Sequence, residues 1–538
     1  MEFPLTLAHL FERAGRLFPR SEIVSRLPDK SLHRHTYADF FRRSQGLIAA
    51  LRKLGLKRGD RVATLMWNHY AHLEAYFAVP CAGGVLHTLN LRLAPDDIAY
   101  IASHAGDRFL IIDDVLLPLF DKVKVNATFE RVIVVPLTSA PVAKEYEDYE
   151  RLIGRARAVK LPRIREDDPA GMCYTSGTTG RPKGVVYSHR ALVLHTLASA
   201  LPDVLGLANS DTVCPVVPMF HVNSWGIPYT AVMTGSKLVF PGPHLDAVSL
   251  LDLYQSENVT LTAGVPTIWG GILQALEQEP SRWKLTPGMR MVVGGAAAPE
   301  SMFRAFDRFG LRVIHGWGMT ETTPVASVNY LKRELQGLTG DAHYAARAKA
   351  GIPLPFVEAR IATESGEAPW NGETMGELEV RGPWIAAEYH NPVGHGPSDE
   401  SGRWTEDGWF RTGDVATIDA HGYIKITDRI KDLVKSGGEW ISSVDLENAL
   451  VGHPKVAEAA VIAVPDAKWG ERPMAVVVLK AGQSATPDEL RAHLAPRFAK
   501  FWLPDAFEFV KEIPRTSTGK MLKAKLREQF GGRAGTEK

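Results

Sequence analysis

The stretch YTSGTTGRPKG, residues 174–184, is the part of the sequence from which the fold is best inferred. The apolar run AGMC at 170–173 precedes it and, with Tyr174 and Thr175, predicts a short buried strand. Ser188 fits the N-cap of a helix that begins at His189. A strand, a glycine-rich turn and a helix start are typical of an anion site, because free backbone N–H groups can point at phosphate oxygens.

The same stretch contains hydroxyl donors and a mobile cation, at Ser176, Thr178, Thr179 and Lys183. A P-loop would end in Gly-Lys-Ser or Gly-Lys-Thr. Here Pro182 precedes the lysine and Gly184 follows it, so the P-loop is excluded. An ordinary polar loop has a similar composition. Other parts of the chain therefore have to decide between an anion site and a polar loop.

Composition places the chain among ordinary globular enzymes. Its 538 residues predict two to four domains, and 45% are hydrophobic and 23% charged. The formal net charge of +1 argues against a nucleic-acid-binding or membrane-seeking surface. Three scattered cysteines, Cys81, Cys173 and Cys214, form neither a disulfide framework nor a zinc cluster. Because the sequence contains no apolar run of about 18 residues and no signal-peptide pattern, we expect a cytoplasmic protein without a transmembrane segment.

Helices and strands alternate along the first 300 residues. Thr36 fits the N-cap of an amphipathic helix over 37–54, and the turn KRGD at 57–60 leads into a strand over 61–66. Further helices are predicted over 74–79 and 95–104, and further strands over 109–112, 212–217, 236–240 and 291–295. Repeated alternation of this kind indicates an α/β fold of layered, mostly parallel sheets.

The pattern changes from about residue 350. GELEVRGP at 376–383 and GYIKITDR at 422–429 alternate apolar and polar residues, as strands with one exposed face do. A compact unit then follows, with helices over 444–451 and 487–494, strands over 459–464 and 475–479, and a capping box at Ser442 and Asp445. We therefore expect a large domain over 1–428, a hinge over 429–431 and a small α+β domain over 432–538.

Six stretches follow one another in a diagnostic order: YTSGTTGRPKG (174–184), PMFHVNSW (218–225), GGAAAP (294–299), GWGMTETTP (316–324), GWFRTGDVATIDAHGYIKITDRIKDLVKSGGEWIS (408–442) and PRTSTGKMLKAKLR (514–527). Together they strongly resemble the adenylate-forming superfamily of acyl-CoA synthetases, luciferases and peptide-synthetase adenylation domains. PMFHVNSWGIPY and KSGGEWISS are most similar to bacterial medium- and long-chain fatty acyl-CoA synthetases. The resemblance implies a large domain of layered α/β subdomains with a β-barrel-like subdomain, and a small mobile C-terminal domain.

The resemblance also implies two half-reactions. A carboxylate attacks the α-phosphorus of ATP to give an acyl-adenylate and pyrophosphate, and the thiol of coenzyme A then displaces AMP. Charge compensation and positioning dominate the first step, because it brings two anions together. The implied ligands of the β- and γ-phosphates are Ser176, Gly177, Thr178, Thr179 and Gly180, and Lys183 would neutralise these phosphates.

Other motif residues resemble the magnesium and nucleoside ligands of the family. Glu321 is the implied Mg²⁺ ligand, and Thr175 and Thr320 lie where the family places hydroxyls near the α-phosphate and the metal. Asp414 would bind the ribose, and Arg429 would be a second ribose or phosphate contact. The adenine slot is implied at Gly294, Gly295, Ala296, Gly316, Trp317 and Gly318.

Two lysines of the small domain receive different roles by resemblance. Lys520, in TSTGK, is the implied adenylation lysine. The segment from Lys435 to Trp440 would line the thiol channel after the small domain rotates about Lys431. Three further cations lack such a context and are expected to be solvated: Lys523, Lys525 and Arg527.

The acyl site and the substrate are less well defined by the sequence. His221 would orient the carboxylate or pack as an aromatic ring, and Trp225 would gate an apolar acyl tunnel or pack in the core. A medium- or long-chain monocarboxylic acid is favoured, while a short thioether acid such as 3-methylthiopropionate, or an aryl acid, stays open. Alternative functions are an acyl-AMP ligase with another acceptor, a luciferase-like oxygenase and a silent nucleotide-binding protein. The resemblance also suggests a homodimer.

Overall fold

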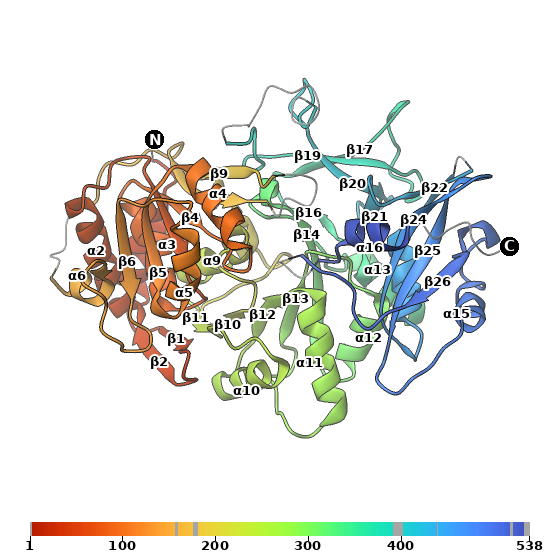
Figure 1. Cartoon of the computed structure of the whole chain (residues 1–538), viewed down its shortest axis with the longest axis horizontal. Coiled ribbons are helices and arrows are strands. Elements are labelled where there is room, and N and C mark those ends of the chain that lie inside the picture. The colour runs from red at the N-terminus through yellow and green to blue at the C-terminus, as the bar shows by residue number, and fades with distance from the viewer. Residues whose placement is uncertain are drawn as a thin grey trace.

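The computed structural model describes residues 3–155, 160–175, 181–390, 402–437, 439–516 and 520–531. Its strands form four sheets, two of which are large and mostly parallel. In Figure 1 the first residues form the left side, the middle of the chain forms the centre, and the last hundred residues form a separate layer on the right. The predicted α/β class is therefore confirmed.

The first large sheet has seven strands in the order β7-β6-β5-β3-β4-β8-β9. All of its strand pairs are parallel except the hairpin of β8 and β9. Its strands are β3 (Arg61–Leu65), β4 (Val85–Thr88), β5 (Asp107–Asp113), β6 (Arg131–Val135), β7 (Glu147–Asp148), β8 (Pro169–Tyr174) and β9 (Gly184–Ser188). Its helices are α2 (Tyr37–Lys53), α3 (Tyr70–Cys81), α4 (Pro95–Ala105), α5 (Leu117–Val123) and α6 (Tyr149–Arg155).

Alternate residues of these strands face different helices, as the two-residue period of a strand requires. Val62 and Ile111 pack in the cluster that contains α2 and α3 residues, whereas Ala63 and Leu110 pack in the cluster that contains α4 and α5 residues. Because both faces are covered, the central residues of β3, β5 and β6 are mostly apolar. This explains why runs such as FLII at 109–112 carry no polar alternation.

The second large sheet has nine strands in the order β16-β15-β14-β13-β12-β10-β11-β1-β2. Its strands are β1 (Glu22–Arg26), β2 (Leu32–Thr36), β10 (Thr212–Pro215), β11 (Lys237–Phe240), β12 (Leu261–Gly264), β13 (Arg290–Val293), β14 (Arg312–Gly318), β15 (Val325–Val328) and β16 (Ile352–Pro353). The accompanying helices are α1 (Leu7–Leu17), α7 (His189–Ala200), α8 (Val222–Trp225), α9 (Ile227–Thr234), α10 (Ala247–Glu257), α11 (Pro266–Gln278), α12 (Glu300–Asp307) and α13 (Gly340–Ala348). The chain begins in this sheet with the edge hairpin β1–β2, forms the seven-stranded sheet, and then returns to add β10 to β16.

A smaller antiparallel sheet corresponds to the predicted β-barrel-like part. Its strand order is β18-β17-β19-β20-β21. The strands are β17 (Glu358–Thr363), β18 (Gly366–Glu367), β19 (Gly376–Arg381), β20 (Phe410–Ile418) and β21 (Ile424–Arg429). A bridge between Gly351 and Ile424 joins this sheet to the end of the nine-stranded one.

The last sheet has the order β23-β22-β25-β24, and β26 pairs with β25. Its strands are β22 (Val434–Ser436), β23 (Glu439–Ile441), β24 (Val456–Asp466), β25 (Gly470–Leu479) and β26 (Ala506–Phe509), and its helices are α14 (Ser443–Val451), α15 (Pro487–Leu494) and α16 (Lys523–Phe530). Ala459 and Val461 pack with α14 and α15, whereas Ala460 and Ile462 pack with α16. Sheet and helices thus form a small core of their own.

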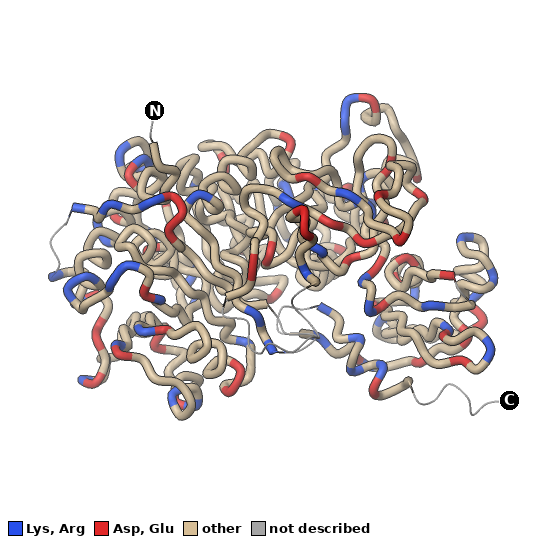
Figure 2. Tube along the Cα trace, turned by 90° about the horizontal axis from the view of Figure 1, so that it is seen from above, with Lys and Arg blue, Asp and Glu red and all other residues tan. Residues whose placement is uncertain are grey.

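Charged side chains are distributed evenly. Figure 2 shows Lys and Arg interspersed with Asp and Glu along the described chain, in keeping with the net charge of +1. Among the helices of the described residues, none is long and apolar enough to span a membrane.

Candidate active site

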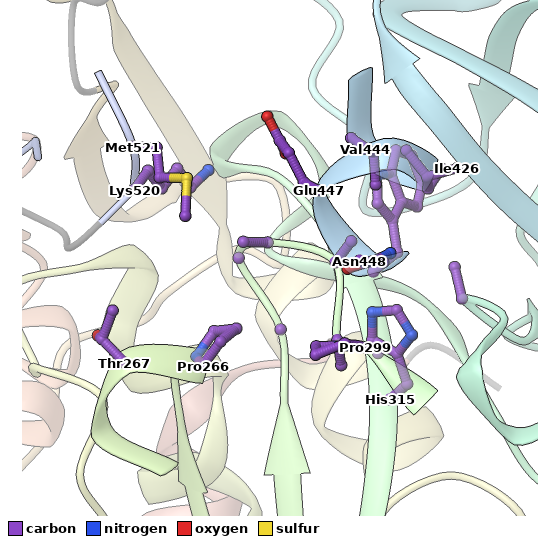
Figure 3. Close-up of a pocket in the computed structure, with 18 of the residues that line it drawn as sticks. Pro266, Thr267, Pro299, His315, Ile426, Val444, Glu447, Asn448, Lys520 and Met521 are labelled. Carbon is purple, nitrogen blue, oxygen red and sulfur yellow. The ribbon is translucent and has the colours of Figure 1, made fainter. Parts of the chain in front are cut away.

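One large cavity, with a volume of about 2730 Å³, contains most of the described residues that the sequence singled out. It lies between the large sheets and the C-terminal layer, and residues from both line it. In Figure 3, Lys520 and Met521 lie on one side of the cavity, Pro266 and Thr267 lie below them, and Glu447 and Asn448 project from α14 on the other side. The cavity is therefore completed by two parts of the chain that are far apart in sequence.

Lys520 reaches this cavity from the segment before α16. Two hydrogen bonds join Lys520 to Thr516: Thr516 N–H donates to the Lys520 carbonyl (2.7 Å), and Lys520 N–H donates to Thr516 Oγ1 (3.1 Å). Burial lowers the pKa of the Lys520 ammonium to about 8. The positive charge of Arg429 adds to this lowering, whereas the carboxylates of Asp414 and Glu321 oppose it. Lys520 is thus near the groups for which the sequence predicts nucleotide and metal binding.

Glu321 lies in the 3-10 helix η2 (Thr320–Thr322), which follows β14, and its side chain is buried. Its Oε1 accepts a hydrogen bond of 2.6 Å from the Tyr389 hydroxyl. The Lys183 ammonium lies 5.1 Å from the centre of the Tyr389 ring. Tyr389 therefore joins the predicted metal ligand to the predicted phosphate-neutralising lysine. Thr320, the neighbour of Glu321, is also buried, and its carbonyl accepts from the Tyr187 hydroxyl at 2.8 Å.

The hairpin of β8 and β9 forms the base of the glycine-rich loop. Thr175 N–H donates to the Lys183 carbonyl (2.9 Å), and Lys183 N–H donates to Thr175 Oγ1 (3.1 Å). The two ends of the loop are thereby held together at the cavity wall, to which both residues contribute. The predicted phosphate ligands between them, Ser176, Gly177, Thr178, Thr179 and Gly180, lie outside the described residues.

Asp414 forms a pair with Arg429, which lies opposite it on β21. Arg429 Nε donates to Asp414 Oδ1 (2.6 Å), and the Trp317 indole N–H donates to Asp414 Oδ2 (2.9 Å). The carboxylate is buried, while the guanidinium is partly exposed. Each carboxylate oxygen keeps a further lone pair, so Asp414 can still accept from the hydroxyls of a ribose.

The ends of β13 and β14 bring small residues against this pair. Gly294, Gly295 and Ala296 follow β13, and Gly316, Trp317 and Gly318 end β14. A Cβ at Gly294 would lie 3.0 Å from the Gly316 carbonyl and 3.0 Å from the Trp225 ring, and a Cβ at Gly295 would lie 3.9 Å from Lys520 Cε. A larger residue would therefore be crowded at Gly294, whereas Gly295 is favoured by its left-handed backbone, with φ of 80°.

His221 and Trp225 flank an unusual turn. Residues 222–225 have φ between 43° and 56°, so the four-residue helix α8 is left-handed, and Gly226 continues it at φ 73°. Left-handed backbone costs about 1–2 kcal/mol per non-glycine residue. The Ser224 hydroxyl donates to the Val217 carbonyl at 2.7 Å, and the turn is buried, which holds this conformation in place.

The two side chains differ in their surroundings. Burial lowers the pKa of His221 to about 3, and the nearby charge of Lys520 lowers it further, so the imidazole is neutral at pH 7. Trp225 is buried with its ring above Gly294, and it lines the cavity. His221 thus lies near Lys520, and Trp225 lies against Gly294.

Lys435 and Trp440 are not brought to this site. They pair with each other in the hairpin of β22 and β23, where both are exposed, and neither is among the described residues that line the cavity. The Lys435 backbone N–H donates to Glu471 at 2.8 Å. Any role of these residues in the cavity requires the C-terminal layer to move relative to the large sheets.

The prediction that Lys523 and Arg527 are solvated is wrong. The Lys523 side chain is 10% exposed and lies 2.7 Å from Glu447 Oε1, and Arg527 is partly buried and lies 2.7 Å from Asp432 Oδ1. Lys525, on the same helix, is exposed as predicted. Sequence reasoning failed here because the acidic partners lie about 75 to 95 residues earlier in the chain.

Sequence reasoning also missed several residues of the site. Tyr389 lies in no motif, and the only available signal was its position just after the apolar stretch at 384–386. Pro266 and Thr267 begin α11 directly after β12, at the end of a parallel strand where ligands commonly bind. Glu447 and Asn448 line the cavity from α14. The sequence predicted this helix but did not indicate that it faces the cavity.

Comparison with known proteins identifies the family of the chain. The profile of the AMP-binding enzyme family matches residues 11–390, and that of the AMP-binding enzyme C-terminal domain matches residues 445–520. The chain is 51% identical to a long-chain-fatty-acid–CoA ligase of Thermus thermophilus, with 98% of this chain and 96% of the relative covered. It is 42% identical to a medium-chain-fatty-acid–CoA ligase of Ectopseudomonas oleovorans, with 99% and 97% covered.

A third relative has another substrate, and a solved structure has the same fold. The chain is 42% identical to a 3-methylmercaptopropionyl-CoA ligase of Ruegeria lacuscaerulensis, with 98% of each chain covered. The crystal structure of ATP-bound MatB from Rhodopseudomonas palustris is similar with a TM-score of 0.83 and 28% identity, covering 98% of this chain and 99% of that one. With its motifs gathered in one cavity and both family profiles matched, the chain belongs to the AMP-binding enzyme family of the adenylate-forming superfamily.

Proposed function

We propose that the protein is an AMP-forming acyl-CoA ligase that activates a medium- or long-chain monocarboxylic acid. Mg-ATP and the acid would give acyl-AMP and pyrophosphate, and coenzyme A would then take the acyl group and release AMP. The observation that carries this proposal is the position of Lys520. It lies in one cavity with Glu321 and the Asp414–Arg429 pair, and its pKa, lowered mainly by burial, also responds to the charges of all three.

The first half-reaction needs a positive charge between two anions. An oxygen of the acid forms a bond to the α-phosphorus of ATP, the bond from that phosphorus to the bridging oxygen breaks, and pyrophosphate leaves. The Lys520 ammonium would contact both the attacking carboxylate and the α-phosphate, so its attraction grows as charge accumulates in the transition state. At pH 7 a pKa of about 8 keeps this lysine mainly protonated.

The donor set near Lys183 fits a hard divalent cation. Mg²⁺ takes one or two oxygen ligands from a protein and the remainder from phosphates and water. Glu321 and Thr175 would hold the ion, and Tyr389 would orient the Glu321 carboxylate through its hydrogen bond. Within the described residues, no group of three or more His, Cys, Asp or Glu side chains could hold a metal by itself. When bound, the ion would supply positive charge to the phosphate oxygens of ATP.

The nucleoside would lie against the ends of β13 and β14. Asp414 would accept hydrogen bonds from the ribose hydroxyls, and Arg429 would orient the Asp414 carboxylate through their ion pair. The glycines at 294, 295, 316 and 318 would leave space for a flat base. The loop residues 176–180, with Lys183, are proposed to bind the β- and γ-phosphates. The MatB structure has ATP bound in the same fold, which supports this assignment.

The second half-reaction would use the hairpin that carries Lys435 and Trp440. We propose a large domain over 1–428, a hinge over 429–431 and a small domain over 432–538, which would rotate about Lys431 after pyrophosphate leaves. Rotation would withdraw Lys520 and bring the hairpin toward the acyl-adenylate. Two features support this: the short connector between β21 and β22, and the exposed position of both hairpin residues.

The acyl chain would occupy the apolar part of the cavity behind Trp225. Its walls include Leu205, Ile227, Val292 and Val328, which belong to the same apolar cluster as Trp225. A pocket of this kind favours an uncharged chain and discriminates poorly between lengths, because each methylene contributes about 1 kcal/mol. His221, neutral and close to Lys520, would orient the carboxylate.

A second candidate substrate is a short thioether acid. The relatives that act on medium-chain fatty acids and on 3-methylmercaptopropionate are both 42% identical to this chain, so similarity alone does not separate them. A cytoplasmic location and a homodimer stay predictions, and sedimentation of the purified protein would test the latter.

The deciding assay measures AMP and pyrophosphate release with Mg-ATP and carboxylic acids from propionate and 3-methylthiopropionate to palmitate, with and without coenzyme A. We expect AMP release that requires coenzyme A and peaks with a medium- or long-chain acid. A peak at 3-methylthiopropionate would select the thioether acid instead. Pyrophosphate release that stops near one turnover and ignores coenzyme A would indicate another acceptor. ATP binding without any release would refute the ligase.

A further inference from the structure

The buried base at the start of α16 connects elements on both sides of the proposed hinge. Lys523 Nζ lies 2.7 Å from Glu447 Oε1 and donates to Ser443 Oγ at 2.5 Å. Ser443 in turn donates to Asp428 Oδ2 through its hydroxyl (2.5 Å) and through its backbone N–H (2.7 Å). A continuous path of hydrogen bonds thus runs from α16 to α14 and on to the end of β21.

The two carboxylates of this path, those of Glu447 and Asp428, are buried, and burying their charges is unfavourable without the positive charge of Lys523. Burial raises the pKa of Glu447 to about 6 and raises the pKa of Asp428, and the positive charge of Lys523 opposes both effects. The same two carboxylates keep the pKa of Lys523 above its ordinary value despite its burial. Because an unpaired buried charge is strongly unfavourable, the lysine and the two acids form one unit.

Two further contacts join β21 to α14 and its N-cap. The Ser442 hydroxyl donates to the Thr427 carbonyl at 2.6 Å, and Lys425 lies 3.0 Å from Asp445 Oδ2. These two contacts and the Ser443–Asp428 hydrogen bonds join residues before 429 to residues after 431, so a rotation about Lys431 would break them. They therefore stabilise the orientation in which Lys520 lies in the cavity.

We propose that Lys523 is a positioning residue for the adenylation half-reaction, which it supports by fastening α14 and the Lys520 segment to Asp428. It lies three residues after Lys520 and holds the C-terminal side of that segment, while the pair of Arg515 with Glu458 (2.8 Å) holds the other side. The described contacts of the Lys523 ammonium are with Glu447 and Ser443, so we assign it a role through these residues and not on the reacting atoms. This inference rests on the proposed ligase function, because it assigns the lysine to one of the two half-reactions.

The test measures each half-reaction separately on the full-length protein. Acid-dependent exchange of labelled pyrophosphate into ATP reports adenylation, and the conversion of synthetic dodecanoyl-AMP and coenzyme A to dodecanoyl-CoA reports thioester formation. We expect Lys523→Met to lower the kcat of exchange about 100-fold, because a displacement of the reacting groups by about 1 Å has an effect of that size. The KM for ATP should change less than about 3-fold, and thioester formation should be less affected than exchange.

Three further variants keep the proposal falsifiable. Lys523→Arg, which retains the charge, should recover most of the exchange, and Lys525→Met, on the exposed face of the same helix, should leave both half-reactions unchanged. If Lys523→Met does not fold, Asp428→Ala decides, since it removes the contact across the hinge and leaves the Lys523–Glu447 pair in place. Equal loss of both half-reactions in folded Lys523→Met or Asp428→Ala, or no loss in either, would overturn the inference.

The wild-type protein separates failure of this inference from failure of the proposed function. If the wild type shows no acid-dependent exchange with any acid, the ligase itself is refuted and the inference falls with it. If the wild type exchanges and the variants match it, only the role of Lys523 is wrong.

Discussion

Replacement of Lys520 by methionine should have opposite effects on activity and stability. Methionine keeps most of the length of the side chain and removes the charge. Removal of one preorganised donor from a developing anionic centre lowers kcat by about 10²- to 10³-fold, and we expect a loss of this size in pyrophosphate exchange. The conversion of supplied acyl-AMP and coenzyme A to the thioester should be much less affected.

The stability change follows from the pKa of Lys520. A decrease from the ordinary 10.5 to about 8 corresponds to about 3 kcal/mol at most. Because the side chain is only half-buried and solvent screens it, we expect Lys520→Met to raise the free energy of unfolding by about 1 kcal/mol, or the Tm by about 2 °C.

The effect of Lys520→Met on the Tm depends on pH, because the folded and unfolded states bind the lysine proton with different pKa values. Below pH 8 the lysine is charged in both the folded and the unfolded state, so the folded wild type bears the full cost. As pH rises from 8 toward 10.5, the folded state loses its proton first and the cost disappears. The Tm advantage of Lys520→Met should therefore be present at pH 7 and shrink above pH 8.

Thermal unfolding followed by circular dichroism at pH 7 and pH 9.5 measures this difference, with Lys525→Met as the control for loss of an exposed charge. A lower Tm for Lys520→Met at pH 7 would show that Lys520 stabilises the fold, and would refute the view that its charge is held at a cost for catalysis. Unchanged pyrophosphate exchange would refute its role in adenylation.

Two further substitutions test the metal site and the backbone. Tyr389→Phe keeps the ring beside Lys183 but removes the hydrogen bond to Glu321, so we expect an increase of about 10-fold in the Mg²⁺ concentration that gives half-maximal exchange. An unchanged magnesium titration would argue against Glu321 as the ligand. Gly318→Ala places a Cβ on the Pro324 carbonyl and should destabilise the protein by at least about 2 kcal/mol in urea unfolding. Gly337→Ala, with nothing within 4 Å, should not, and equal effects would show that the space at Gly318 is not limiting.

The sequence by itself determined the features that depend on neighbouring residues. Thr36, Ser188 and Ser442 each cap the helix for which they were selected, and the helix over Pro487–Leu494 has the predicted ends. Strand–helix alternation predicted the parallel sheets, because burial on both faces leaves an apolar run without a two-residue period. The order of the six motifs predicted the family, which the comparisons confirm.

Only the tertiary structure decided which distant residues meet. It placed Tyr389 on Glu321, 68 positions away, and gave Lys523 its buried partners Glu447 and Ser443. The left-handed turn at 222–225 was also not predicted from the sequence, since only Asn223 of its four residues is of a type that favours such a backbone. These features depend on the path of the whole chain, because a charge or a strained backbone is stabilised by atoms that only the folded core brings within a few ångströms.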